Sequence, residues 1–459
     1  MAEQMKPSGI DWIKDIPSSW EINKVKYLAT EPGTLFLDGD WIESDVIEES
    51  GIRYLTTGNV GAGFYKEQGS GYISEKTFSE LHCLNVYPGD LMISRLNEPI
   101  GRSCIIPDTE SRYVVAVDNV ILRPNANYNK KFIMYGMNAD GYAEHANMIA
   151  RGATMSRISR SQLGQFWLAF PNIEEQQAIA DFLDKECARI DSIAADLEKQ
   201  IALLQQYKKS LITETVTKGL DKSVPMKDSG VEWLGKIPAH WNFKRLKFML
   251  ENSSDSMKVG PFGSALSGSD FTDEGKWVYN QRVVLDNNFS ENTTFVSEEK
   301  FQEMRSFAVY PGDILITTRG TIGKVAIVPE GANEGILHPC IIKFRVDKEM
   351  IIPELLQLIF NESDFVKDQF TLMSNATTIE VIYSYSLKDI LLPVIPADEQ
   401  EKIYGYLSKK CIAIDGIISE KQKALATIIQ HKKSLIYEYV TGKKKSKGGA
   451  VRWPLKQGN

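Results

Sequence analysis

Residues 208–217 read Lys-Lys-Ser-Leu-Ile-Thr-Glu-Thr-Val-Thr, and residues 432–441 read Lys-Lys-Ser-Leu-Ile-Tyr-Glu-Tyr-Val-Thr. Four further stretches recur at nearly the same separation along the chain. They are Met5–Trp12 with Met226–Trp233, Ile16-Pro17-x-x-Trp20 with Ile237-Pro238-x-x-Trp241, Tyr87–Asp90 with Tyr310–Asp313, and Glu175-Gln176-x-x-Ile179 with Glu399-Gln400-x-x-Ile403. The chain therefore contains two copies of one unit of about 220 residues, and such a duplication predicts an internal near two-fold relation.

Each copy ends in a long segment, 174–217 or 398–441, that lacks proline and contains only Gly405 and Gly416 as glycines. Apolar residues recur in both segments at spacings of mostly three and four. They are Ile179, Leu183, Ile190, Ile193, Leu197, Leu204 and Leu211, and then Ile403, Leu407, Ile414, Ile417, Leu425, Ile428 and Leu435. This spacing predicts two helices with an apolar stripe, each extending roughly 66 Å. We expect the stripes to form an antiparallel coiled coil and a subunit interface; the alternative is two core helices of a bundle.

The rest of each copy mixes short apolar strands with helical stretches. Leu91–Ser94 and Ile314–Thr317 each follow a Pro-Gly-Asp turn, and Tyr113–Leu122 is expected to form a further strand. The sequence thus predicts an α+β fold with two repeated domains, joined and separated by two long antiparallel helices. The expected boundaries are 1–172 and 219–395 for the α+β domains, 173–218 and 396–442 for the helices, and 443–459 for a basic, disordered tail.

The bulk properties favour a soluble cytoplasmic protein. No apolar run is long enough to cross a membrane, and the first residues lack a signal peptide's apolar core. The five cysteines form no CxxC pair, so neither a disulfide framework nor a zinc site is expected. No metal-ligand spacing, nucleophile motif or phosphate-binding loop appears, and Gly58-x-x-Gly61-x-Gly63 fits a tight turn better than a nucleotide loop. We therefore expect no catalytic residues, no metal and no cofactor in this chain.

Duplex DNA is a suitable partner for a near two-fold molecule, although the net charge is −7. A DNA-binding face must therefore be local. The candidates are loops in which the copies differ and which carry arginine, asparagine, threonine, serine or lysine, the residues that contact bases and phosphates. They are Thr57, Asn59, Arg95, Asn97, Arg102, Arg151, Thr154 and Arg157 in the first copy, and Ser264, Arg282, Thr318, Arg319, Lys324, Asn375 and Thr377 in the second. Solvated hairpins are the alternative interpretation of these loops.

Taken together, the duplicated motifs resemble the DNA-specificity subunit of a type I restriction–modification system. The resemblance covers almost the whole chain and rests on the Ile-Pro-x-x-Trp and Glu-Gln-x-x-Ile motifs, on Ile190-Asp191 with Ile414-Asp415, and on the two helix ends. One departure is Phe170-Pro171-Asn172, which matches only partly the proline-rich step that the family places before Glu-Gln. That departure blurs where the first helix begins.

The resemblance implies that two target-recognition domains each read one half of a split site and that the helices set the unread gap. It also implies double-stranded DNA, two methyltransferase subunits and two motor–endonuclease subunits as partners. Those partner subunits use S-adenosylmethionine, ATP and magnesium. Because the scaffold motifs match while the loops differ, the two half-sites should differ and the target should be asymmetric. The competing hypotheses are a coiled-coil adaptor without DNA specificity and a free-standing nuclease.

Overall fold

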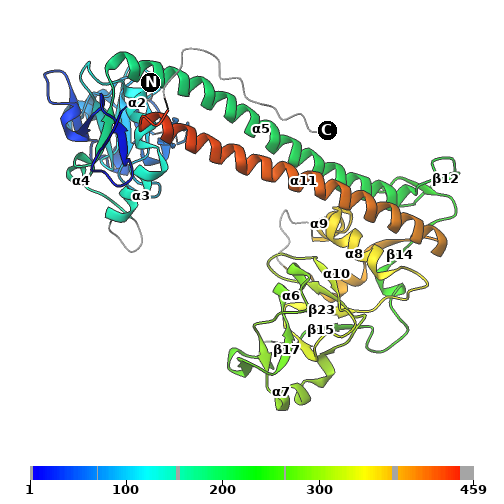
Figure 1. The fold of residues 1–459 in the computed structure, drawn as a ribbon. Helices are drawn as coiled ribbons and strands as arrows, with labels where there is room; N and C mark the ends of the chain where they lie inside the picture. Colours follow the sequence, from blue (N-terminus) through cyan, green and yellow to red (C-terminus); the bar gives the residue numbers. More distant parts are fainter. Residues whose placement is uncertain (1–3, 70, 151–155, 263–264, 375–380, 445–459) are drawn as a thin grey trace. The chain divides into compact units, whose positions relative to one another are not determined.

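The computed structural model describes residues 4–69, 71–150, 156–262, 265–374 and 381–444 (Figure 1). The chain divides into two compact units: unit 1 comprises residues 1–197 and 423–459, and unit 2 comprises residues 198–422. The division falls inside both long helices, so each unit contains one α+β segment and a part of each helix.

The long helices are α5 (Ile173–Lys218) and α11 (Ala397–Val440). In unit 1 the rings of Phe182 and Tyr439 lie 4.6 Å apart, and Lys432 pairs with Asp191 at 2.6 Å. From the first contact to the second, the residue number increases along α5 and decreases along α11. The two helices therefore run antiparallel within this unit.

Unit 2 repeats this arrangement with its own parts of the same helices. Lys208 of α5 pairs with Asp415 of α11 at 2.7 Å, and Lys421 donates to Gln200 at 2.6 Å. Lys208 and Asp415 are the repeat equivalents of Lys432 and Asp191, so the duplicated sequence forms the same ion pair in each unit.

The α+β segment of unit 1 is built on a four-stranded antiparallel sheet and a three-stranded sheet that contains one parallel pair. The four-stranded sheet has the order β4 (Leu35–Asp38), β10 (Asn119–Arg123), β7 (Leu91–Ser94), β8 (Ser103–Ile105), and the other has the order β6 (Tyr72–Ile73), β5 (Ile52–Leu55), β9 (Tyr113–Val115). Two strand pairs and four helices complete it: β1 (Met5–Pro7) with β2 (Asp15–Pro17), β3 (Glu21–Lys24) with β11 (Trp167–Phe170), α1 (Glu75–Glu80), α2 (Lys130–Met137), α3 (Asp140–Ile149) and α4 (Arg160–Gly164).

The segment of unit 2 follows the same plan. Its four-stranded antiparallel sheet has the order β15 (Met257–Val259), β23 (Ile341–Phe344), β20 (Ile314–Thr317), β21 (Val325–Ile327), and its five-stranded sheet has the order β16 (Phe271–Thr272), β18 (Phe295–Val296), β17 (Lys276–Tyr279), β22 (Gly335–Leu337), β19 (Ala308–Val309). The remaining elements are β12 (Met226–Asp228) with β13 (Lys236–Pro238), β14 (Asn242–Arg245) with β24 (Leu391–Val394), α6 (Gln281–Asp286), α7 (Glu298–Glu303), α8 (Pro353–Glu362), α9 (Phe365–Ser374) and α10 (Ser384–Lys388).

This architecture confirms the predicted α+β class with two repeated domains. One predicted strand was wrong: Tyr113–Leu122 forms two strands, β9 and β10, which belong to different sheets. A turn closed by the bond from the Asn119 amide to the Ala116 carbonyl interrupts the apolar run. The sequence shows the apolar residues but not this change of sheet.

The Ile-Pro-x-x-Trp motifs contact the ends of the long helices. Trp20 and Trp241 are buried, and glycines with a left-handed backbone follow the helices, Gly442 after α11 and Gly219 after α5. A Cβ on Gly442 would lie only 2.4 Å from Cδ of Pro17, and one on Gly219 would lie 3.4 Å from Trp241. Both positions need glycine because its backbone reaches this conformation without strain.

The Glu-Gln motifs lie in the first turn of the same helices. Gln176 is buried; its side chain accepts from the Asn129 amide at 2.9 Å and donates to the carbonyls of Asn127 and Pro171. Gln400 makes the equivalent bonds to Ile352, Met350 and Ile395. Because a buried amide is stable only when its polar atoms are paired, this glutamine joins the α+β segment to the helix in each copy.

Candidate nucleic-acid interface

The loop that follows β7 carries three of the predicted DNA-binding residues, and the structure separates them. Arg95 is buried, with its guanidinium donating to the carbonyls of Val117 at 2.6 Å and Ile158 at 3.2 Å and pairing with Asp38 at 3.1 Å. Burial lowers the pKa of Arg95, and the nearby Asp38 carboxylate opposes that shift. These contacts give Arg95 a structural role and leave it little access to DNA in this conformation.

Arg102 holds the same loop from its other end. Its guanidinium donates to the carbonyls of Thr57 at 2.9 Å, Val60 at 2.8 Å and Asn97 at 2.8 Å. Asn97 itself is exposed and adopts a left-handed backbone conformation, with φ 60°. Of the three loop residues, Asn97 is exposed, Arg102 is half-buried and Arg95 is buried.

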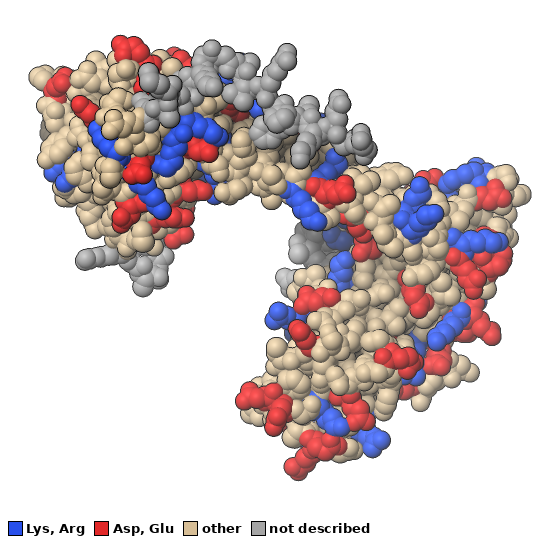
Figure 2. Space-filling view, in the orientation of Figure 1, with Lys and Arg blue, Asp and Glu red and all other residues tan. Residues whose placement is uncertain are grey.

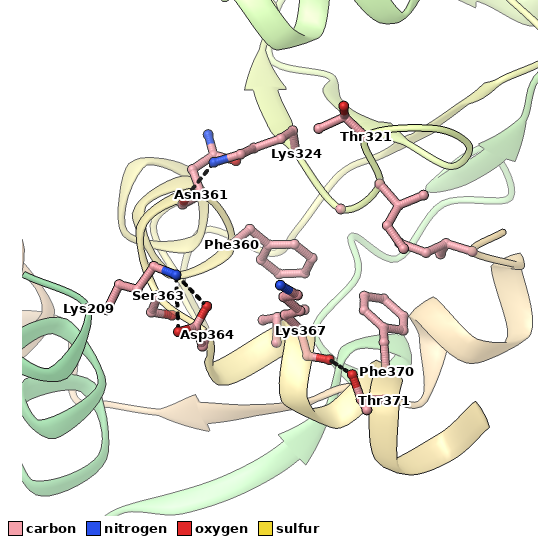
Figure 3. Close-up of a pocket in the computed structure, with 14 residues that line it drawn as sticks. Lys209, Thr321, Lys324, Phe360, Asn361, Ser363, Asp364, Lys367, Phe370 and Thr371 are labelled. Carbon is pink, nitrogen blue, oxygen red and sulfur yellow. Dashed lines mark hydrogen bonds and ion pairs between the residues drawn. The ribbon is translucent and has the colours of Figure 1, made fainter. Parts of the chain in front are cut away.

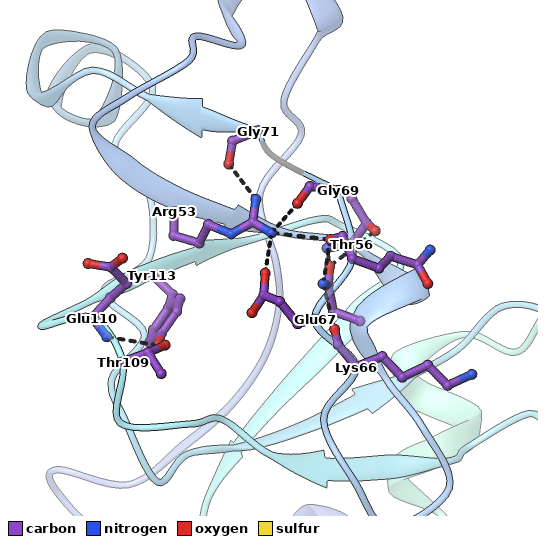
Figure 4. A network of polar contacts seen from close by, with 11 residues as sticks. Arg53, Thr56, Lys66, Glu67, Gly69, Gly71, Thr109, Glu110 and Tyr113 are labelled. Atoms are coloured by element: carbon purple, nitrogen blue, oxygen red, sulfur yellow. Dashed lines mark hydrogen bonds and ion pairs between the residues drawn. The ribbon is translucent and has the colours of Figure 1, made fainter.

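Thr57 and Asn59 belong to a loop that a buried arginine organises (Figure 4). Arg53 donates to the carbonyls of Gly69 at 2.6 Å and Gly71 at 3.0 Å and pairs with Glu67 at 3.0 Å. Asn59 is 1% exposed, and its amide donates to the Lys66 and Gln68 carbonyls. Asn59 therefore stabilises the loop, whereas the Thr57 side chain is half-buried. The expected tight turn at Gly58 is a short 3-10 helix over Thr57–Asn59.

Two surface arginines of unit 1 are held by acidic residues beneath them. Arg157 pairs with Asp118 at 2.6 Å, and Arg160 pairs with Asp38 at 3.1 Å. Both side chains stay accessible, with 49% and 39% of their surface exposed. Asp38 also pairs with the buried Arg95, so one carboxylate links the interior to the surface. Arg160 was not among the selected candidates, although residues 145–173 contain Arg151, Arg157 and Arg160 and no acidic residue.

The loop that follows β20 in unit 2 is less charged. Thr318 is buried and donates to the Cys340 carbonyl at 2.9 Å, and the Lys324 ammonium donates to the Asn361 carbonyl at 2.6 Å. Arg319 is exposed, while Arg282 on α6 is exposed and lies 3.4 Å from Asp286. Arg319 and Arg282 are thus the accessible cations of this set among the residues described.

Exposed aromatic side chains of unit 2 were not among the selected candidates. Tyr383 and Tyr385 are more than half exposed and stack with their ring centroids 5.4 Å apart at 8°. Phe262 is 85% exposed. For the tyrosines, the available signal was their position just after Ile382, whose amide donates to the Thr318 carbonyl.

Five further candidates, Arg151, Thr154, Ser264, Asn375 and Thr377, lie outside the described residues. Of the predicted tail, Lys443 and Lys444 are held in unit 1: Lys443 donates to the carbonyls of Ile13 at 2.7 Å and Asp15 at 3.1 Å, and Lys444 pairs with Glu438. Residues 445–459 lie outside the described residues.

The predicted apolar stripe of the long helices is only partly buried. The buried members are Ile179, Leu183, Ile190, Ile403, Leu407, Ile414 and Leu435, and the half-buried ones are Leu197, Leu204, Leu211, Leu425 and Ile428. Ile193 and Ile417, which are repeat equivalents, are 36% and 44% exposed. The residue after Ile417, Ile418, is 8% exposed. Whether the exposed pair meets another subunit stays a prediction.

The surface shows no extended basic field on the face in Figure 2, where lysine and arginine alternate with aspartate and glutamate. Within the described residues, no three histidine, cysteine or acidic side chains are grouped to hold a metal ion. Burial raises the pKa of the Cys104 thiol to about 12, which favours a packing role over a reactive one. No helix among the described residues is long and apolar enough to cross a membrane.

Comparisons with known proteins match this duplicated arrangement. A family model described as the type I restriction modification DNA specificity domain matches residues 21–203 and 258–426. The type I restriction enzyme MjaX specificity subunit of Methanocaldococcus jannaschii is 24% identical over 380 residues, covering 81% of this chain and 82% of that protein. The EcoBI specificity subunit of Escherichia coli is 24% identical over 323 residues, covering 69% of this chain and 66% of that protein.

Two solved structures share the fold. A chain from a structure that concerns complex assembly and conformational transition of the type I R-M system has a TM-score of 0.69 at 13% identity, covering 94% of this chain and 99% of that one. The HsdS subunit from Thermoanaerobacter tengcongensis has a TM-score of 0.50 at 12% identity, covering 94% and 98%. At these identities the likeness concerns the fold alone.

Proposed function

Because the chain belongs to the type I restriction–modification DNA specificity family, we propose that it binds a bipartite, asymmetric DNA target and directs partner subunits to that target. In this proposal each α+β segment is a target-recognition domain that reads one half-site. The chain itself is non-catalytic.

One observation carries the asymmetry. The two segments have the same four-stranded sheet and the same Gln contacts, yet the side chains beside the loops that follow β7 and β20, the reading loops of this proposal, differ. Arg157 and Arg160 in the first correspond to Val381 and Ser384 in the second, counted from the equivalent bonds that Ile158 and Ile382 donate to Arg95 and Thr318. A guanidinium and an isopropyl group cannot select the same bases, which supports two different half-sites.

The partners follow from the same proposal. Two methyltransferase subunits and two motor–endonuclease subunits would join the DNA-bound chain, and they would supply S-adenosylmethionine, ATP and magnesium. Linkage of two weak readers in one chain supports useful affinity without a large basic surface, because the second half-site binds at high effective concentration. Methylation of a base requires it to leave the stack, so we expect the assembled complex to distort the DNA.

The decisive experiment is sequencing of genomic DNA with detection of base modification, in a strain with and without this gene. We expect a bipartite, asymmetric methylated motif that disappears on deletion. An unchanged methylation pattern, in a strain whose partner methyltransferase is shown to be active, would contradict the proposal and favour an adaptor without DNA specificity.

A further inference from the structure

Unit 2 contains a pocket of about 510 Å³ behind its reading loop (Figure 3). Residues 321–324 form one side, α8 and α9 form the floor, and Lys209 of α5 contributes to the rim. Its volume lies within the range of roughly 300–1,000 Å³ that is common for small-molecule sites.

The first segment carries a buried tyrosine at the position of a valine that lines this pocket. Lys433 pairs with Asp140 in unit 1 as its repeat equivalent Lys209 pairs with Asp364 in unit 2. Two residues beyond each aspartate stand Tyr142 and Val366. They are therefore structural equivalents, and valine replaces a ring that is fully buried in the first segment.

The surrounding contacts agree with this equivalence. A Cβ placed on Gly101 would lie 3.0 Å from the Tyr142 ring, and the equivalent glycine, Gly323, lines the pocket together with Val366. Both glycines have a φ of +78°. The fold therefore accommodates a tyrosine at this position in the first copy and a valine in the second.

The lining combines apolar walls with positive charge. Phe360, Phe370 and Ile382 are almost fully buried and form the walls, while Lys324 and Lys367 stand beside them (Figure 3). The one acidic residue among the described lining residues, Asp364, is already paired with Lys209 at 2.9 Å. A matching ligand offers a flat apolar body and an anionic group, and a nucleotide has both.

We propose that this pocket binds one nucleotide, with the base against Phe360 and Phe370 and the phosphate near Lys324 and Lys367. The nucleotide comes either from a DNA strand next to the reading loop or from free solution. The DNA source rests on the proposed function. It is supported by the sequence position of residues 321–324, which begin two residues after the exposed Arg319. Base–aromatic contact and charged hydrogen bonds supply the affinity.

The first test titrates the full chain with dAMP, monitored by ligand-observed NMR. Val366→Tyr installs the residue that the first copy carries and should weaken binding at least tenfold. Lys367→Glu should weaken it comparably, and because Lys367 is exposed this change should leave the fold intact. Leu372→Tyr, an exposed position on the same helix, is the matched control and should bind as wild type.

The second test uses the assembled methyltransferase complex and its target duplex with 2-aminopurine at successive positions of the second half-site. Fluorescence that rises in the wild type, and is lost in Val366→Tyr, supports a nucleotide from DNA. Binding of dAMP without such a rise supports a free nucleotide. If dAMP does not bind and no fluorescence rise is lost in Val366→Tyr, or if both variants behave as wild type in both tests, the inference is overturned. If the wild-type complex binds no target at all, the proposed function fails, while the dAMP titration still decides about the pocket.

Discussion

The two α+β segments share the strand register of their four-stranded sheets but carry different side chains at equivalent positions of that register. In unit 1, Asp38 pairs across the sheet with Val120, and in unit 2, Val259 pairs with Ile342 in the same register. The position of a carboxylate in one sheet is thus occupied by an isopropyl group in the other.

The replacement extends to the whole cluster around that position. In the first segment Asp38 pairs with both Arg95 and Arg160, and Arg157 pairs with Asp118 nearby. The equivalent residues of the second segment are Val259, Thr318, Cys340, Val381 and Ser384, counted from the shared strand register and from the bonds of Ile158 and Ile382. One scaffold therefore tolerates either a charged network or an almost uncharged surface, and the surface chemistry can change without a change of fold.

The largest expected effect comes from removing the centre of the charged cluster. Arg95→Ala leaves Asp38 with one cation fewer and the carbonyls of Val117 and Ile158 without their donor, and should cost about 3 kcal/mol. Thr318→Ala, the equivalent change in unit 2, removes one hydrogen bond and should cost about 1 kcal/mol. Hydrogen exchange of β7 and β10 against β20 and β23 measures each unit separately. Equal losses would contradict the contrast between the segments.

The next effect concerns the glycine that follows each long helix, which is packed more closely in unit 1 than in unit 2. Gly442→Ala forces a left-handed backbone and brings Cβ within 2.4 Å of Pro17, so we expect a loss of about 2 kcal/mol. Gly219→Ala has the same backbone strain but a Cβ contact of 3.4 Å, and should cost about 1 kcal/mol. Thermal unfolding of both variants provides the comparison, and a larger loss for Gly219→Ala would show that the contact with Pro17 is not the cause.

Much of this fold could be predicted from the sequence because its determinants are local and occur twice. The Pro-Gly-Asp turn before β7 and β20 is one example: the Asp90 and Asp313 carboxylates accept the amides of Tyr87 and Tyr310 three residues earlier. The apolar spacing of α5 and α11 is another, because the spacing of three and four residues that indicates a helix is present within each segment itself.

The site was predicted less well because its determinants are distant in sequence. Arg95 in a polar loop looks like a DNA-binding residue, but its acidic partner Asp38 is 57 residues earlier and its acceptor Ile158 is 63 residues later. Only the folded chain brings these groups together and buries the guanidinium. For the same reason Arg157, whose partner Asp118 lies 39 residues earlier, emerges only from the structure as the more accessible candidate.

The comparison also predicts how the two half-sites respond to mutation and to salt. Arg157→Ala should weaken binding of the assembled complex to its target about tenfold, equivalent to about 1.4 kcal/mol, because it removes an accessible guanidinium. Val381→Ala at the equivalent position should change affinity less than twofold. If Arg157 contacts a phosphate, the slope of log Kd against log salt should also fall by about one. Equal effects at both positions would refute the asymmetry.

The smallest effect distinguishes the segments by pH. Burial raises the pKa of Asp40, although a hydrogen bond from the Leu84 amide opposes the shift. A carboxyl group with a raised pKa binds its proton more tightly in the folded state, so it favours folding at low pH and this contribution is lost as pH rises through the raised pKa. Asp40→Asn keeps an acceptor for Leu84 but cannot ionise, so it should stabilise unit 1 near neutral pH by less than about 1 kcal/mol. Unit 2 has Pro261 at the equivalent position, after Gly260, and should show no such dependence.

Unfolding measured from acidic to neutral pH tests this against Asp108→Asn, an exposed control. If the stability difference between Asp40→Asn and wild type did not grow with pH, the buried carboxylate would carry no penalty, and the contrast between the segments would be confined to the arginine cluster.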